Sequence, residues 1–200
     1  MKNLIIDCET LGTRDNAIVP MFAAIVTDDE LSIKDNLKNL IILHPSIEEQ
    51  RQNGGTEEQA TLYWWKSQSI DTFNTVMSQT NSLPLLECAK KFDSFLVEKG
   101  YSKNDNPFIW QRGSKDEDWL KNVFASCGNA YKLDWWSVRD IRTAIDVLGA
   151  SSKQNGYMDA DKVSDEGTML LMKMNEKGKA HHPAYDVVRD FVFLRSLKLV

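Results

Sequence analysis

Asp7 and Glu9 stand two residues apart at the end of an apolar run, Leu4 to Ile6, and the segment breaks at Gly12. An apolar run that ends in this way is typical of a buried strand. Side chains two apart on a strand point to the same side, so both carboxylates enter one small volume. Like charges this close destabilise each other unless a cation or a proton intervenes, which indicates a site for a hard divalent metal. The pair alone is equally compatible with two acidic residues that fringe a strand end by chance.

Further carboxylates are needed for chemistry on a phosphate, because a two-metal site takes about four of them and water attack benefits from a general base. Segment 115–128 has helical spacing, with an apolar stripe that begins at Trp119 and Leu120. Four residues before Leu120 comes Asp116, at the N-terminal end of the buried face. Asp118 points away from this stripe. We therefore expect Asp116 to be the third carboxylate, with Asp118 as the reserve.

A histidine pair precedes the last apolar helical pattern of the chain. His181 lies just before that pattern, and Asp186 falls in its first turns. The pKa of histidine suits proton abstraction near neutral pH, so His181 is a candidate general base and Asp186 a candidate fourth carboxylate. His182 competes for the same role. From the residues alone, such a pair is more often a helix cap and a solvated neighbour.

The elements that position these residues begin with three expected strands. After the strand that carries Asp7, segments 17–29 and 36–44 are rich in Ile, Val and Leu and are bounded by polar turn residues. Short connections favour antiparallel pairing. A helix is expected from Thr56, which begins an arrangement close to a capping box, and an amphipathic packing helix over 84–99.

Strands and helices alternate in the later part of the chain, which predicts parallel or mixed pairing with helices on the faces of an α/β sheet. The polar segment 151–167 contains two glycines and is expected to be a mobile surface loop. The remaining patterns predict strands at 107–111 and 132–138, and helices at 115–128, at 139–149 and from Pro183 onward.

Composition bounds the class of protein. A chain of 200 residues with 42% hydrophobic and 26% charged residues fits one globular domain over 1–200. No apolar run is long enough to cross a bilayer, and the N-terminus carries no secretory pattern, so we expect the mature chain to start at Met1 and to have no membrane segment. The cysteines, Cys8, Cys88 and Cys127, have no paired spacing, which fits a reducing compartment and indicates neither a zinc site nor a disulfide framework.

The net charge of -5 gives no global attraction for nucleic acid. Composition therefore argues weakly against a protein that coats DNA or RNA nonspecifically. An enzyme that carries its own metal cations escapes this argument, because the bound cations reverse the local charge of the acidic ligands.

Three motifs in order resemble those of the DnaQ-like, or DEDDh, 3′→5′ exonucleases. They are D-x-E at Asp7 and Glu9, Asp116 before its apolar helix residue, and H-x4-D from His181 to Asp186. Within that superfamily, segments 61–69, 110–120 and 136–143 are similar to those of the T4-type phage exodeoxyribonucleases, the exonuclease A group, which is related to mycobacterial exoribonucleases. The similarity runs from Leu4 to about Phe193.

The resemblance implies a ribonuclease H-like mixed central sheet flanked by helices, in a single exonuclease domain. It makes Asp7, Glu9, Asp116 and Asp186 the ligands of two Mg²⁺ or Mn²⁺ ions, and His181 the general base. The H-x4-D spacing favours His181, since counting from His182 leaves one residue too few. At the second motif Lys115 stands where an aromatic residue is common, and an alignment from Gly113 points to Glu117. The third ligand therefore stays open among Asp116, Glu117 and Asp118.

The implied reaction is removal of nucleoside 5′-monophosphates from the 3′ end of single-stranded nucleic acid, with DNA favoured over RNA. The same resemblance implies a phage-encoded protein in the host cytoplasm. An exoribonuclease of the same fold is the first alternative, and a non-catalytic nucleic-acid-binding module is the alternative from another class. The five candidate chemical residues argue against an idle module.

Several residues are candidates for contact with the substrate. Thr10 and Leu11 resemble the positions that touch the terminal nucleotide, by backbone contact and by apolar packing; a strand-end residue and a core leucine are the equal alternative. Trp65 could stack on an unpaired base, although its neighbour Trp64 points about 100° away and one of the two belongs in the core. Arg112, Arg139 and Arg142 are candidate phosphate contacts, with surface ion pairing as the commoner fate of an arginine.

Overall fold

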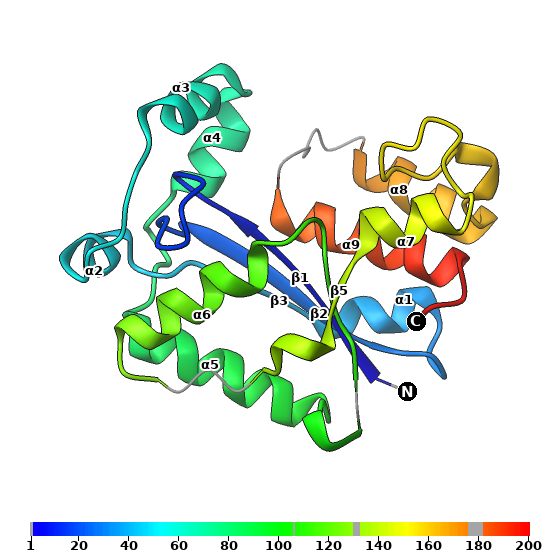
Figure 1. Ribbon diagram of the computed structural model, residues 1–200, viewed down its shortest axis with the longest axis horizontal. Helices are drawn as coiled ribbons and strands as arrows, with labels where there is room; N and C mark the ends of the chain where they lie inside the picture. The colour runs from blue at the N-terminus through cyan, green and yellow to red at the C-terminus, as the bar shows by residue number, and fades with distance from the viewer. Residues whose placement is uncertain (1, 106, 130–132, 176–181) are drawn as a thin grey trace.

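A mixed five-stranded sheet forms the centre of the protein in the computed structural model, which describes residues 2–105, 107–129, 133–175 and 182–200 (Figure 1). The strand order is β3-β2-β1-β4-β5, so the strand that carries Asp7 and Glu9 is the middle one. β1 pairs antiparallel with β2 and parallel with β4, β2 pairs antiparallel with β3, and β4 pairs parallel with β5. The strands are β1 (Lys2–Glu9), β2 (Met21–Asp28), β3 (Leu40–Leu43), β4 (Ile109–Gln111) and β5 (Val138–Asp140).

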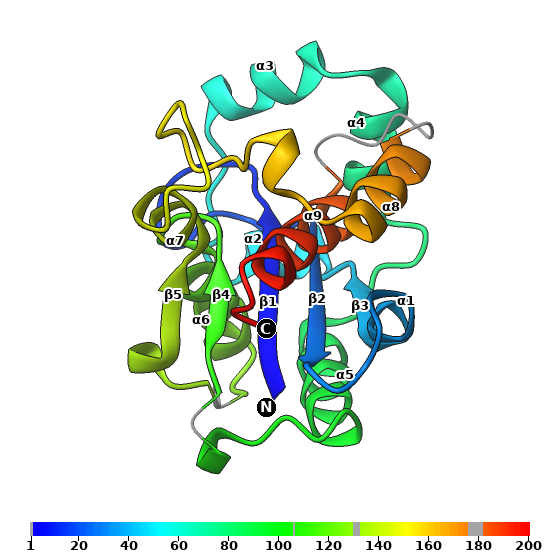
Figure 2. The ribbon, with the colours of Figure 1, turned by 90° about the vertical axis from the view of Figure 1, so that its right-hand side faces the viewer.

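Helices lie on both faces of this sheet, which makes the fold α/β as the sequence predicted (Figure 2). The longer helices α5, α6 and α9 fall within or close to their predicted segments, and short 3-10 turns lie at Leu37–Asn39, Lys103–Asp105, Trp135–Ser137 and Ala160–Lys162. The helices are α1 (Ile33–Asn36), α2 (Ile47–Gln52), α3 (Gln59–Ser67), α4 (Ile70–Met77), α5 (Leu85–Glu98), α6 (Asp116–Ser126), α7 (Ile141–Val147), α8 (Asp165–Asn175) and α9 (Pro183–Ser196).

β1 divides its side chains between two cores. Leu4, Ile6 and Cys8 pack in the core beneath α5 and α6, whereas Ile5 packs in the opposite core beneath α7 and α9. Side chains alternate along a strand, so Asp7 and Glu9 continue the Ile5 side. The two carboxylates therefore leave the sheet on the face that α9 covers.

α9 begins with a defined cap. Pro183 occupies its first turn, where a missing N–H costs nothing, and the ring Nδ1 of His182 accepts a hydrogen bond from the Ala184 N–H at 3.2 Å. Val187 and Phe191, both fully buried, then hold the helix against the sheet. This packing fixes the direction in which the first turn of α9 points.

A third, smaller core lies beyond the end of β1. Leu11, Ile18 and Met21 pack there with Ile47 of α2 and Trp65 of α3. Figure 1 shows α3 and α4 together at this end of the sheet. The residues that follow Glu9 are thus held by packing.

Two predicted strands are longer than the observed ones for local reasons. Segment 17–29 was expected to be one strand, but β2 begins only after Pro20, which has no N–H to contribute to a ladder. Segment 36–44 loses its first residues to helical structure, because the Ser32 hydroxyl caps α1 by accepting from the Asp35 N–H at 3.1 Å.

The polar segment 151–167 was expected to be a mobile loop, yet it contains a 3-10 turn and the start of α8. Ser152 N–H and hydroxyl both donate to the Asp159 carboxylate, and Asp159 N–H donates to Ala150 O at 2.9 Å.

The predicted strand 132–138 is wrong in part. Lys132 lies outside the described residues, 135–137 form a 3-10 turn, and β5 starts at Val138. Helices α1, α2, α4 and α8 were not predicted. In the described ranges no helix has the length and apolarity to cross a membrane.

Candidate active site

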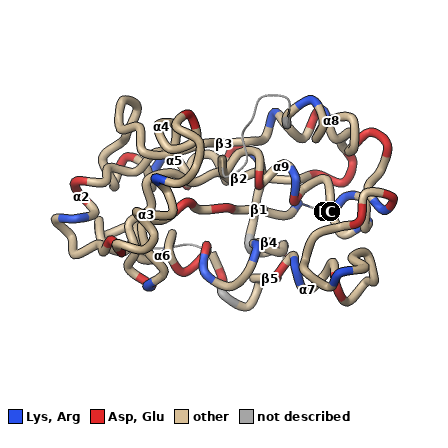
Figure 3. Tube along the Cα trace, turned by 90° about the horizontal axis from the view of Figure 1, so that it is seen from above, with Lys and Arg blue, Asp and Glu red and all other residues tan. Residues whose placement is uncertain are grey.

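Three carboxylates meet at the end of the central strand. Asp7, Glu9 and Asp186 each offer an oxygen atom within 4.8 Å of the others. The first two come from β1 and the third from the first turn of α9. Figure 3 shows the acidic stretch of β1 in the middle of the molecule, with charged positions of α6 and α9 on either side. The structure thus brings together residues that lie almost 180 positions apart in the sequence.

Asp7, Glu9 and Asp186 line a cavity of about 630 Å³. Asp116, the first residue of α6, lines the same cavity. Its Oδ1 accepts a hydrogen bond from the backbone N–H of Cys8 at 2.9 Å, and the residue is only 4% exposed. Since Cys8 lies between Asp7 and Glu9, this bond joins α6 to the part of β1 that carries them. The first strand and the second predicted motif are therefore parts of one site.

The two alternatives to Asp116 lie elsewhere. Glu117 N–H donates to the Gln111 side chain at 2.8 Å, and neither Glu117 nor Asp118 lines the cavity formed by the described residues. Of the three acidic residues left open by the sequence, Asp116 is the one that the structure brings to Asp7 and Glu9. Its role as a ligand stays a prediction.

His181 lies outside the described residues, so its predicted role as general base stays a prediction. His182, its competitor, uses its ring nitrogen to cap α9. The sequence alone had favoured a helix cap as the role of one histidine of this pair, and His182 has that role.

Burial and mutual repulsion disfavour ionised carboxylates in this cavity. Burial raises the pKa of Asp7 well above its ordinary value, and the negative charges of Glu9, Asp116 and Asp186 raise it further. Burial also raises the pKa of Glu9, followed by the charges of Asp186 and Asp116, while Arg189 opposes the rise. Burial raises the pKa of Asp116 to about 7, against the Cys8 N–H bond, which lowers it.

A divalent cation fits this donor set. The cavity gathers carboxylate oxygens whose charges repel one another, and a bound cation would remove that repulsion. Hard oxygen ligands of this kind suit Mg²⁺ or Mn²⁺.

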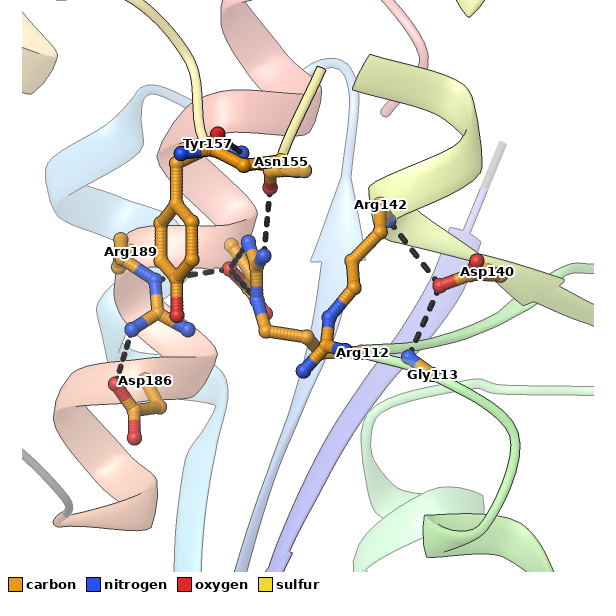
Figure 4. Close-up of polar contacts among 10 residues, drawn as sticks. Arg112, Gly113, Asp140, Arg142, Asn155, Tyr157, Asp186 and Arg189 are labelled. Carbon is orange, nitrogen blue, oxygen red and sulfur yellow. Dashed lines mark hydrogen bonds and ion pairs between the residues drawn. The ribbon is translucent and has the colours of Figure 1, made fainter. Parts of the chain in front are cut away.

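Two arginines hold the α9 side of the site. Arg189 pairs with Asp186 one turn earlier on α9, and its Nε donates to Asp190 at 3.0 Å. Arg112 also pairs with Asp190, at 2.5 Å, and the guanidinium groups of Arg112 and Arg189 lie 4.5 and 5.5 Å from the centroid of the Tyr157 ring (Figure 4). Asp186 is therefore held by an arginine whose own position is set by a buried network.

Arg112, expected to contact substrate phosphate, is engaged within this network. Its side chain is 6% exposed, its Nη2 and Nε bind Asp190, and its Nη1 donates to Gly156 O at 2.6 Å. Donors already used by buried partners are poorly placed to receive a phosphate. Arg112 therefore positions Asp190 and the backbone at Gly156.

Trp65 cannot stack on a base, contrary to the prediction, because it is 1% exposed. Its Nε1 donates to Thr10 O at 2.9 Å, so the ring supports the residue that follows Glu9. The neighbouring Trp64 is 42% exposed and lies edge-on to it, with ring centroids 4.8 Å apart. Of the tryptophan pair, Trp65 is the core member.

Leu11 is also a core residue, at 2% exposure, which is the second of the two alternatives that the sequence allowed. The Thr10 carbonyl accepts from Trp65, and its hydroxyl donates to Gly12 O at 2.7 Å. Direct contact of Thr10 with the terminal nucleotide stays a prediction. The direct contact of Leu11 with a base, by contrast, is contradicted by its burial.

Sequence reasoning missed several residues that line the cavity. Arg189 lies three residues after Asp186, a helical spacing that would have found the pair. Tyr157 lies in the segment expected to be mobile, where no periodicity gives a side-chain direction. Tyr185 and Trp119 also line the cavity.

Comparison with known proteins extends these observations. A family model described as the 3′-5′ exoribonuclease Rv2179c-like domain matches residues 2–188. The exodeoxyribonuclease of Enterobacteria phage T4 is 24% identical to this chain over 216 aligned residues, which cover 98% of this chain and 88% of that protein.

Two solved structures are similar over 98% of this chain, each with a TM-score of 0.57. They are the zinc-bound form of the E. coli ExoI–ssDNA complex, at 16% identity, and the cell-death related nuclease 4 (CRN-4), at 13% identity. This chain spans 40% of the first and 64% of the second, so it is shorter than either. At these identities the likeness concerns the fold, which is the ribonuclease H-like α/β fold.

Proposed function

This chain belongs to the family of 3′-5′ exoribonuclease Rv2179c-like domains, in the DnaQ-like exonuclease superfamily, and on that premise we propose a metal-dependent 3′-5′ exodeoxyribonuclease that acts on single-stranded DNA. The family supports 3′-5′ exonuclease activity. The observation that carries the metal dependence is the convergence of Asp7, Glu9 and Asp186 within 4.8 Å. The likeness to the phage T4 exodeoxyribonuclease supports DNA as the polymer.

Asp7, Glu9, Asp116 and Asp186 would hold two Mg²⁺ or Mn²⁺ ions. Cations bound there would lower the pKa of a water molecule and offset the charge of the phosphate oxygens. The negative charges of Glu9, Asp116 and Asp186 all act on Asp7, which therefore lies among them. We expect the loss of Asp7 to reduce activity more than the loss of any other of the four carboxylates.

The protein supplies proton transfer and positioning. His181 would take the proton of the attacking water, since the H-x4-D spacing places it just before the helix that carries Asp186. Arg189 holds the Asp186 carboxylate through its ion pair, and the Cys8 N–H holds that of Asp116. Attack on the last phosphodiester of a 3′ end releases a nucleoside 5′-monophosphate.

RNA is the second candidate substrate, because the matching family is described as exoribonucleases. The two polymers differ at the 2′-hydroxyl, which is the group that lets a protein tell RNA from DNA. A direct comparison of matched sequences decides between them.

The test uses 5′-labelled single-stranded DNA and RNA of one sequence, incubated with Mg²⁺, Mn²⁺ or a chelator. We expect a ladder that shortens from the 3′ end, only with metal and faster on DNA. Asp7→Ala should abolish it. His181→Ala should slow it severely, whereas His182→Asn, which keeps a helix-capping acceptor, should not.

Three outcomes would contradict parts of this proposal. Cleavage that persists in chelator, or full activity of Asp7→Ala, overturns the metal mechanism. Faster cleavage of RNA than of DNA would make RNA the preferred substrate. Binding of either polymer without any shortening identifies a non-catalytic module.

A further inference from the structure

The three arginines that the sequence offered as phosphate contacts have different surroundings. Arg112 is buried and paired with Asp190. Arg139 donates from Nη1 to Trp136 O at 2.9 Å and to Val138 O at 2.8 Å, and its guanidinium lies 4.4 Å from the Phe108 ring centroid. Both are therefore committed to the protein itself.

Arg142 differs because it is exposed and lines the cavity of the carboxylates. Its backbone N–H donates to Asp140 Oδ1 at 3.1 Å, which fixes the start of α7. Figure 4 shows its side chain extending away from α7, with a dashed contact only at that backbone nitrogen. Within residues 2–105, 107–129, 133–175 and 182–200 its guanidinium has no hydrogen bond or ion pair.

The aliphatic part of Arg142 is held by close packing. A Cβ atom on Gly156 would lie 2.5 Å from Arg142 Cγ, so the backbone of Gly156 presses directly on this side chain. Gly156 is itself anchored, because its N–H donates to Asp146 Oδ1 at 3.0 Å and its carbonyl accepts from Arg112 at 2.6 Å. The stem is therefore positioned while its charged end remains available.

The charge of Arg142 also acts on the site. Its guanidinium is among the groups that lower the pKa of Asp116, against the larger effect of burial. A positive group that lines a cavity of carboxylates without a carboxylate of its own suits a ligand that brings negative charge. A phosphodiester fits, since a guanidinium binds phosphate oxygens with two parallel donors.

We propose that Arg142 binds a phosphate of the substrate strand at or next to the scissile bond. The inference rests on the proposed function, because it takes the occupant of the cavity to be a nucleic acid strand. It assigns to Arg142 the phosphate contact that the sequence shared among three arginines.

The salt dependence of substrate binding tests this assignment. Each phosphate contact to a single strand contributes about 0.7 to the slope of log affinity against log salt. Arg142→Ala should therefore flatten the slope by about 0.7, and lower kcat/KM about ten- to hundredfold, as expected for a charged hydrogen bond. Arg142→Lys should keep the slope. Arg139→Ala, three residues away, is the matched control and should keep both the slope and kcat/KM.

Affinity is measured by fluorescence anisotropy of a labelled deoxyoligonucleotide, so the readout does not need turnover. Strands with one neutral methylphosphonate locate the contact: Arg142→Ala should lose its effect only on the strand whose contacted phosphate is neutral. A wild-type slope in Arg142→Ala, or the same change in Arg139→Ala, overturns the assignment. If the wild type binds but shortens neither polymer, the proposed function fails while the slope still decides the role of Arg142. If the wild type binds neither polymer, both fail.

Discussion

The Asp116 carboxylate is bonded to the backbone of the strand that carries Asp7 and Glu9, through Cys8 N–H at 2.9 Å. The bond fixes the start of α6 relative to β1. The Asp116 side chain thus has two roles: it accepts the hydrogen bond that holds α6 to β1, and it contributes a negative charge to the cavity. The two roles can be separated experimentally.

Asp116→Asn separates them, because asparagine keeps an acceptor for the Cys8 N–H and removes the charge. We expect a folded protein whose exonuclease rate falls at least about a hundredfold, since loss of groups that merely support a metal ligand already costs ten- to hundredfold. Mn²⁺ affinity, measured by titration, should fall with it. The control Asp118→Asn should stay within about twofold of the wild type. Equal losses in both variants would move the third ligand away from residue 116.

The pH dependence of stability should reveal the carboxylate cluster in the metal-free protein. The pKa of Asp116 is raised to about 7 in the folded state, and those of Asp7 and Glu9 are raised too, so the folded state binds more protons than the unfolded one. The free energy of unfolding in chelator should therefore fall as pH rises from about 4 to about 7. Denaturant titrations at several pH values measure this.

Saturating Mg²⁺ should remove most of that slope, because the cation takes the place of the protons. Asp116→Asn should reduce the slope in chelator. Stability that rises with pH in chelator across this range would show that the carboxylates are not destabilised in the folded state.

The Arg112–Asp190 pair predicts a large loss of stability. Their side chains are 6% and 2% exposed, so Arg112→Ala leaves a buried carboxylate without its main partner. Such truncations cost about 3 to 5 kcal/mol in the free energy of unfolding, measured by urea denaturation. Lys38→Ala, which breaks an exposed pair with Asp35, is the control and should cost less than about 1 kcal/mol. Similar small losses for both would mean that the buried pair is dispensable.

Gly156 and Gly128 form a matched pair for testing the close packing of Gly156 against Arg142. Both have positive φ angles, 72° and 75°, but a Cβ on Gly156 meets Arg142, whereas one on Gly128 meets nothing within 4 Å. Gly128→Ala should cost only the left-handed strain of about 1 to 2 kcal/mol. Gly156→Ala should cost more and also lower kcat/KM. Thermal unfolding and exonuclease kinetics compare them, and equal effects would show that the close contact carries no function.

Local spacing was sufficient for the parts of the site that lie on regular elements. Asp7 and Glu9 share a face because strand side chains alternate, and Asp116 could be chosen over Asp118 from the stripe of α6, in agreement with its burial. The α/β class followed from the alternating patterns of the second half.

Contacts between distant segments were beyond the sequence. Nothing local shows that Trp65 donates to Thr10, or that Arg112 pairs with Asp190, because each partner is set by how α3 or α9 packs. The segment 151–167 was expected to be mobile on its polar composition, yet Ser152 bonds to Asp159 within it, and the backbone N–H of Gly156 donates to Asp146 of α7. Composition reports polarity but not where the bonds go.

The order of the site residues along the chain has a consequence for synthesis. Asp7, Glu9 and Asp116 are made before α9, which carries Asp186 and its partner Arg189. A nascent chain that still lacks α9 has an incomplete set of carboxylates and no helix over that face of the sheet. On the proposed function, the carboxylate set is complete only once α9 has docked on the sheet, so a chain released before α9 is made is expected to show no exonuclease activity.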